Sequence, residues 1–247
     1  MLSFLKRWSA LWVALLLVLI LVYAPARLVG WLVPASVSLE GLGGTLWQGR
    51  AARAAIAVNN NVFMLGQLTW RLRPLSLLRL QPALDITSDW GEQTLAAQVA
   101  TDPSGALILR DLEASTDVGW VRNLIPLYVE GRVRASFLEL KVREAQVEAA
   151  TGRVVWEGAA WAARAGNLPL GTYVLDLEGE RGAIAGEVLT LSGGLAIAGD
   201  IALDGRDYRV AITLDGPAMR DEGLQQATAL FAIPDGGKYR VDLSGSL

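Results

Sequence analysis

The sequence contains no histidine and no cysteine. Without these residues there can be no disulfide, no thiolate nucleophile, no Ser-His-Asp or Cys-His arrangement, and no metal site built on imidazole or sulfur. Most enzyme classes are therefore excluded. The absence of cysteine does not assign a compartment, because cysteine-free proteins occur in oxidising and in reducing surroundings. We predict no catalytic residue, no metal site and no cofactor.

An excess of positive charge is also missing. The chain has 22 Lys and Arg residues against 25 Asp and Glu residues, interspersed along the sequence, and a formal net charge of -3. A protein that binds nucleic acid needs a basic surface to neutralise phosphates. Nucleic acid is therefore not an expected partner.

The longest run without a charged residue lies near the N-terminus. It extends from Trp8 to Ala26, directly after Lys6 and Arg7, and its length falls in the range of roughly 17 to 25 residues that spans a bilayer. Basic residues flank the cytoplasmic end of a membrane helix. We therefore predict a cytoplasmic tail at 1–7, a transmembrane helix at 8–26, a juxtamembrane linker at 27–35 and an exported body at 36–247.

The same segment also fits a cleavable signal peptide. The sequence Ala24-Pro25-Ala26 has the small-x-small pattern of a cleavage site, and the most apolar part, from Leu11 to Val22, is short enough for the core of a signal. Aromatic residues such as Trp8 and Tyr23 lengthen the run at its ends and favour a retained anchor. Cleavage after Ala26 stays open as the alternative.

From Ser36 onward, apolar residues recur at every second position, which is typical of strands with one buried face. The clearest example consists of Leu195, Ile197, Gly199, Ile201 and Leu203. Successive segments end in Asp-Gly or Ser-Gly, as at Gly205 and Gly245, and these dipeptides favour tight hairpin turns. We predict a mainly β body built as an antiparallel meander.

Three stretches depart from this alternation. Helical spacing predicts two short helices, one at Asp117–Tyr128 with caps at Ser115 or Thr116, and one at Asp221–Phe231. Between residues 131 and 142 the apolar positions change parity, which predicts a bulge or a bend near Phe137.

Two similar phrases lie roughly a hundred residues apart: GGTLWQGRA at Gly43–Ala51 and GRVVWEGAA at Gly152–Ala160. The similarity suggests an internal duplication with possible halves at 36–148 and 149–247. In equivalent positions, each phrase would use glycine to bend a strand, and Trp47 and Trp156 would each fill the core beneath it.

Several groups could in principle carry chemistry. The carboxylate pairs Asp111 with Glu113 and Asp221 with Glu222 have no neighbouring base and are interpreted as solvated surface. The glycines at positions 41, 43 and 44 lack the lysine and the spacing of a phosphate-binding loop, so we interpret them as backbone devices.

Two sets of residues are also compatible with a groove that binds a ligand. Tryptophans at strand spacing more often belong to the core than to a groove, and this applies to Trp47, Trp70, Trp156 and Trp161. Opposite the Leu/Ile row of the last strands, the chain has Ala196, Ala198, Ala202 and Ala211. Such a weakly polar face reflects an alanine-rich coding bias, is covered by a helix, or meets something apolar, such as a lipid chain or another protein.

Four phrases, in their order and spacing after the N-terminal run, resemble the type II secretion system protein N family (general secretion pathway protein N). They are Gly44–Ala51, Trp70–Leu78, Gly152–Ala160 and Leu230–Gly245. The resemblance implies a single-pass protein of the Gram-negative inner membrane with a periplasmic body. It would be an accessory component of the machine that exports folded proteins across the outer membrane, with other type II secretion subunits and the inner membrane as partners, and not an enzyme.

The expected architecture is also similar to the AsmA-like group, whose curved β-sheets are associated with lipid handling. This is an analogy of fold alone. It leaves a periplasmic lipid-binding or lipid-transfer module with an apolar groove as the alternative function, and lipid as a possible further partner.

Overall fold

The computed structural model describes residues 12, 16, 19–20, 22–58, 61–77, 81–119, 128–144, 146–163 and 166–246. The chain forms two compact units, Met1–Trp90 and Gly91–Leu247, called unit 1 and unit 2 below. The boundary predicted between two related halves, 148/149, falls inside strand β9 (Gln146–Ala163) of unit 2. The duplication itself stays a prediction.

The predicted cytoplasmic tail at 1–7 and most of the predicted transmembrane segment at 8–26 lie outside the described residues. Within the part of the chain that the structure describes, no helix is both long enough and apolar enough to cross a membrane. The predicted linker contains a 3-10 helix, η1 (Ala26–Leu28), and one turn of α-helix, α2 (Val29–Leu32).

Unit 1 is an antiparallel sheet with the strand order β1-β3-β4-β5, and β2 pairs with β3. Its elements are β1 (Val37–Glu40), β2 (Gly43–Gly44), β3 (Gln48–Val58), β4 (Asn61–Leu72), α3 (Pro74–Leu77) and β5 (Ala83–Trp90). Its core contains Ala26, Ala51 and Trp70. The Trp70 indole Nε1 donates a hydrogen bond to the Leu46 carbonyl oxygen at 3.2 Å.

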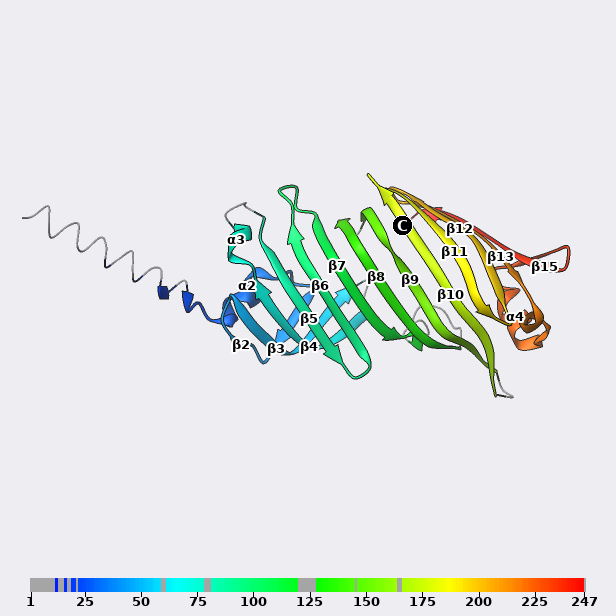
Figure 1. The fold of residues 1–247 in the computed structure, drawn as a ribbon, viewed down its shortest axis with the longest axis horizontal. Helices are drawn as coiled ribbons and strands as arrows, with labels where there is room; N and C mark the ends of the chain where they lie inside the picture. Colours follow the sequence, from blue (N-terminus) through cyan, green and yellow to red (C-terminus); the bar gives the residue numbers. More distant parts are fainter. Residues whose placement is uncertain are drawn as a thin grey trace, which may run out of the picture. The chain divides into compact units, whose positions relative to one another are not determined.

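Unit 2 is an antiparallel meander in which β6 to β13 lie side by side in chain order, followed by β15 and then β14 (Figure 1). Its strands are β6 (Gln93–Thr101), β7 (Leu107–Asp117), β8 (Val129–Arg143), β9, β10 (Gly166–Glu180), β11 (Ala183–Gly193), β12 (Ala196–Asp204), β13 (Asp207–Asp215), β14 (Ile233–Asp235) and β15 (Lys238–Ser246). The prediction of a mainly β, antiparallel body is confirmed.

Two short helices, η3 (Pro217–Arg220) and α4 (Glu222–Thr228), connect β13 to β14. The prediction of a helix at Asp221–Phe231 is confirmed. Asp221 caps α4, because its Oδ1 accepts a hydrogen bond from the backbone N–H of Leu224 at 2.8 Å, which satisfies one of the free donors of the first turn.

The other predicted helix, Asp117–Tyr128, falls mainly on residues 120–127, outside the described residues. The caps predicted for it were wrong, because Ser115 and Thr116 belong to β7 and pair with Arg134 and Val133 of β8. The strand alternation continues through these residues, so their hydroxyl groups do not begin a helix.

The bulge predicted near Phe137 is confirmed. Phe137 pairs with Gly152 of β9, and Glu139 pairs with Thr151, so Leu138 is an extra residue on β8. The extra residue changes the parity of the apolar positions that follow. It also turns Leu138 outward, where the residue is 71% exposed.

The two tryptophan phrases do not occupy equivalent positions, which corrects the prediction for Trp47 and Trp156. Trp47 lies in the bend before β3, whereas Trp156 lies in the middle of β9. Glycine does bend the strand in the second phrase, since Gly158 has a φ of +59° beside a register shift between β8 and β9. The two similar sequences therefore have different structural surroundings.

A different pattern does recur, in which an aromatic ring covers a glycine of the adjacent strand. Trp70 covers Gly49, Phe137 covers Gly152 and Tyr208 covers Gly245. A Cβ atom built on Gly49 or Gly152 would lie 2.3 or 2.4 Å from a ring atom. The glycines therefore admit rings that lie flat against the sheet, a known way to pair glycine across strands.

We expect Gly152→Ala to destabilise unit 2 by about 1 to 3 kcal/mol, because the added methyl group forces the Phe137 ring or the backbone of Ser136 to move. Gly194→Ala is the matched control, since the nearest atom to its Cβ would lie at 3.6 Å, an ordinary contact. Urea unfolding of the full-length protein in detergent measures both changes. Equal unfolding midpoints for the two variants would contradict the role assigned to the glycine.

Candidate functional site

The sheet of unit 2 separates apolar and charged side chains onto opposite faces. In strands β10 to β13 and β15, the paired positions place every charged residue on one face, whereas the other face carries aliphatic and aromatic residues and Thr190. We call the second face the apolar face. Its members on these strands are Tyr173, Leu175, Leu177, Ile184, Val188, Thr190, Ile197, Ile201, Leu203, Tyr208, Val210, Ile212, Leu214, Tyr239, Val241 and Leu243. On β8 and β9 it continues through Val133, Ala135, Phe137, Ala150, Val154 and Trp156.

The helices η3 and α4 cover one end of the apolar face. In Figure 1, the label α4 marks this end of the strands. The core there is formed by Val118, Val129, Ala159, Trp161, Leu170, Tyr173, Leu195, Leu214, Ala218, Met219, Leu224, Ala232 and Val241. The Tyr173 hydroxyl donates to the Leu195 carbonyl oxygen at 2.9 Å, and burial raises the pKa of Tyr173 to about 12. This end is a closed core.

The remainder of the apolar face is different. Val154, Leu175, Val188, Ile201 and Val210 form adjacent rows, are half-buried and do not belong to the core cluster under α4. At the last strand, Leu243 is 43% exposed. A sheet with an apolar face requires a second layer against that face, so this surface is the candidate functional site.

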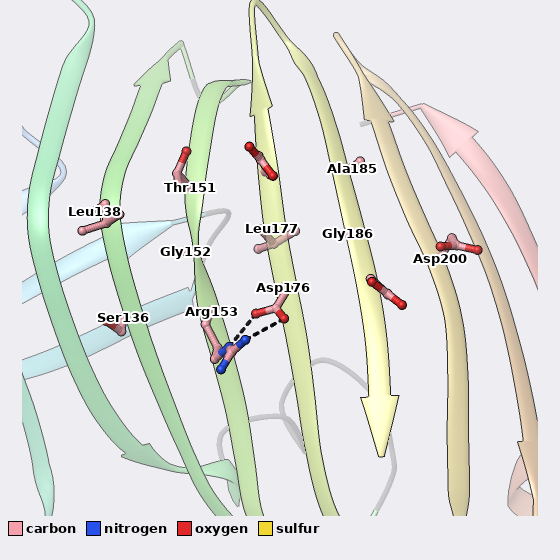
Figure 2. Close-up of a pocket in the computed structure, with 12 residues that line it drawn as sticks. Ser136, Leu138, Thr151, Gly152, Arg153, Asp176, Leu177, Ala185, Gly186 and Asp200 are labelled. Atoms are coloured by element: carbon pink, nitrogen blue, oxygen red, sulfur yellow. Dashed lines mark hydrogen bonds and ion pairs between the residues drawn. The ribbon is translucent and has the colours of Figure 1, made fainter. Parts of the chain in front are cut away.

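The opposite face carries a shallow groove of about 700 Å³ across β8 to β12. Figure 2 shows Arg153 of β9 and Asp176 of β10 pointing toward each other, with two contacts of 2.6 and 2.9 Å between guanidinium and carboxylate. This hydrogen-bonded pair holds the pKa of Asp176 below its usual value. Because Asp176 engages the arginine, the other carboxylates, Glu178, Glu187 and Asp200, leave the groove acidic.

A second charged cluster joins the turn between β6 and β7 to strands β8 and β9. The Lys141 ammonium lies 2.9 Å from Asp102 and 3.2 Å from Glu148. The side-chain hydrogen bond from Ser104, followed by that from Lys141, lowers the pKa of Asp102 well below its usual range. Asp102 also accepts backbone N–H bonds from Ser104 and Ala106, both at 2.9 Å. The cluster organises the turn rather than a reaction centre.

The carboxylate pairs considered in the sequence lie at exposed or helix-capping positions. Asp111 and Glu113 are exposed, and Asp111 accepts a hydrogen bond from Gln98 Nε2 at 2.9 Å. Asp221 caps α4. Of the glycines at positions 41, 43 and 44, two are backbone devices as predicted, because Gly41, before β2, and Gly44, the last residue of β2, have φ values of +66° and +90°.

The core interpretation of the tryptophans is confirmed for three of them. Trp70 and Trp161 are 7% and 8% exposed, and Trp156 packs against the core cluster. Trp47 is half-buried in the bend before β3. Trp47 and Trp70 belong to unit 1, whereas Trp156 and Trp161 belong to unit 2.

The alanine face, which the sequence left open as a surface for something apolar, also carries charged residues. Ala196, Ala198, Ala202 and Ala211 are exposed on the charged face, which also carries Asp200 and Arg209. The face that needs a partner is instead the Leu/Ile row, which the sequence analysis did not consider as a binding surface. One signal for this was present, because the last strands carry many large apolar residues and the two predicted helices are short.

Sequence comparison finds relatives that match most of the chain. The sequence profile of the family described as type II secretion system (T2SS), protein N, matches residues 35–242. The chain is 31% identical over 252 residues to the type II secretion system protein N of Aeromonas hydrophila, covering 97% of each chain. It is 28% identical over 228 residues to the protein of the same name from Vibrio cholerae serotype O1, covering 87% of this chain and 86% of the relative.

No solved structure matches the chain. The family match covers both units, from the residues just before β1 to the middle of β15, and the relatives align along nearly their full lengths. The chain therefore belongs to the type II secretion system protein N family.

Proposed function

We propose that the protein is an accessory inner-membrane component of the type II secretion system that supports the export of folded proteins across the outer membrane. The observation that carries this proposal is the family match over residues 35–242. The architecture fits an interaction subunit rather than an enzyme, because its main surface is an extended apolar sheet face and its charged clusters pair with one another.

The proposed topology is a single-pass anchor with a cytoplasmic N-terminus and a periplasmic body. It rests on the charge-free run from Trp8 to Ala26 after two basic residues. The alternative cleavage site, Ala24-Pro25-Ala26, packs within unit 1. Ala24 and Ala26 are 6% and 2% exposed, and the Ala24 carbonyl oxygen accepts a hydrogen bond from Leu46 at 2.8 Å. Cleavage after Ala26 would remove these contacts, which favours a retained anchor.

Deleting the gene is expected to reduce the secretion of type II substrates and to trap them, folded, in the periplasm. Immunoblots of periplasm and culture medium measure this distribution, and the wild-type gene on a plasmid should restore it. Proteins exported by other routes serve as the control. Normal release of type II substrates in the deletion strain would contradict the proposal.

A second candidate function is a periplasmic lipid-binding or lipid-transfer module. The specific observation in its favour is the apolar face, which carries no charged residue on β10 to β13 and β15 and is half-buried beyond the α4 end. An acyl chain would give these residues the apolar contacts that a second protein layer gives in an ordinary core. The two candidates are compatible, since a secretion subunit could hold lipid.

A further inference from the structure

The end of the proposed anchor is joined to unit 1 without a flexible tether. The backbone N–H of Tyr23 donates to the Leu19 carbonyl oxygen at 2.9 Å, so helical hydrogen bonding continues to Tyr23. The next residue, Ala24, already accepts a hydrogen bond from the backbone of Leu46. The chain therefore passes from the anchor into the fold of unit 1 within one residue.

The segment that follows is also held against unit 1. Ala26 is 2% exposed and belongs to the core of this unit, and Val29 of α2 packs against the same core. Residues in 3-10 and α-helices advance the chain by at most about 2 Å each, so Trp31 of α2 lies within about 10 Å of Ala26. The headgroup layer on each side of the hydrocarbon core is roughly 5 to 7 Å thick. Trp31 is therefore close to the level at which the proposed span ends.

The Trp31 side chain points away from the protein. Two residues along an α-helix differ in direction by about 200°, so Trp31 lies on roughly the opposite side of α2 from Val29. Its side chain is 85% exposed, although tryptophan is on average a highly buried residue. Exposure of a large ring next to a membrane anchor indicates a partner at that level.

The neighbouring residues indicate that this partner is lipid. A stable protein interface needs about 800 Å² from each side, whereas one tryptophan supplies at most about 250 Å². Arg27 and Gly30 beside it are exposed and add little apolar area. A guanidinium next to an indole instead suits the headgroup layer, which offers phosphates to the first and a boundary between apolar and wet surroundings to the second.

We propose that the Trp31 indole inserts into the headgroup layer of the bilayer that holds the anchor, with Arg27 facing lipid phosphates. This contact rests on the proposed single-pass topology and adds a second attachment to it. With one attachment at Ala24 and another at Trp31, unit 1 is seated on the membrane surface in a fixed orientation rather than suspended from the anchor.

The test uses a nitroxide label beside Trp31 in the full-length protein. The chain has no cysteine, so Gly30→Cys creates a single labelling site. A Cβ atom at Gly30 would lie 3.8 Å from its nearest neighbour, Leu42 Cδ1, which is an ordinary contact. The protein is reconstituted into vesicles of phosphatidylethanolamine and phosphatidylglycerol. Electron paramagnetic resonance measures how far oxygen and a water-soluble nickel complex reach the label, and spin-labelled lipids in the same vesicles calibrate its depth.

We expect the label at position 30 to lie at the depth of the headgroups. Adding Trp31→Ser should move it into water and raise its accessibility to nickel by about twofold or more, whereas Trp31→Tyr, which keeps an interfacial aromatic ring, should leave it in place. Trp31→Ser should not change the melting temperature in detergent, because the side chain is exposed. A lower melting temperature would mean that the indole packs on protein, and this would overturn the proposal.

A second label, introduced by Leu16→Cys in a chain with the native Gly30, tests the anchor separately. If the label at position 16 lies at acyl-chain depth while the label at position 30 lies in water, or does not respond to Trp31→Ser, the seat on the membrane is wrong and the topology stands. If the label at position 16 lies in water, the proposed topology is wrong and the seat fails with it. Neither result depends on whether secretion changes.

Discussion

Replacing Trp156 by alanine is expected to lower the free energy of unfolding by about 3 kcal/mol. This is the lower end of the range for removing a tryptophan from a packed interior, because the indole is partly rather than fully buried. Its ring centroid lies 5.6 Å from that of Tyr173, and its Nε1 donates to the Glu130 carbonyl oxygen at 3.2 Å. The variant loses both contacts and leaves a cavity beside the core cluster.

Glu157→Gln is the matched control for this change. Glu157 is the next residue on β9 and points to the charged face, where it pairs with Arg134 at 3.0 Å. Both side chains of this pair are more than a third exposed, so its loss should cost at most about 0.5 kcal/mol. Urea unfolding of full-length protein in detergent, followed by near-ultraviolet circular dichroism, measures both variants. A Trp156→Ala protein with an unchanged midpoint would show that the indole serves a ligand rather than the core.

The features that sequence predicted correctly are local. The alternation around Ile197 and Ile201 follows from the two-residue period of a strand, and the turn residues set where each strand ends. The bulge at Leu138 was visible as a change of parity, because one inserted residue reverses the faces of all residues after it. The capping of α4 by Asp221 is equally local, since acceptor and donor lie three residues apart.

The features that sequence missed depend on partners distant in the chain. Whether Trp47 and Trp156 are equivalent is decided by the strands beside them, and these differ although the surrounding letters agree. The covering of Gly49 by Trp70 and of Gly152 by Phe137 requires the strand register, which no motif in either phrase encodes.

The choice of the functional face failed for a third reason. Alternation shows that a strand has two unlike faces, but it does not show whether the apolar one is covered. The sequence analysis did not ask whether the apolar rows that contain Val188 and Ile201 are covered, because large apolar residues in strands are most often buried. In unit 2 the core cluster under α4 includes Tyr173 and Leu214, while Val188 and Ile201, further along the strands on the same face, are half-buried. The sequence analysis did not compare the apolar surface of the strands with the short helices predicted to cover it.

Ile201→Asp is expected to abolish the copurification of phospholipid with the full-length protein, if the apolar face holds acyl chains. Ile201 points to the apolar face from the middle of β12, and its paired neighbours are Gly186 and Val210. A carboxylate there would lie among acyl chains without a partner charge, which strongly disfavours binding. We expect bound phospholipid to fall by about tenfold or more, measured by mass spectrometry of organic extracts after purification in a mild detergent.

Ala202→Asp provides the control within the same strand. Ala202 is adjacent in sequence, is exposed, and points to the charged face opposite Arg209, so a carboxylate there stays in water and can pair with a guanidinium. This variant should retain wild-type phospholipid and melting temperature. Melting curves of both variants separate loss of lipid from loss of fold. Equal phospholipid in the two variants, or none in the wild type, would rule out lipid as the layer over the apolar face. The covering layer would then have to be protein, because half-buried rows such as Val188 and Ile201 still require apolar contacts.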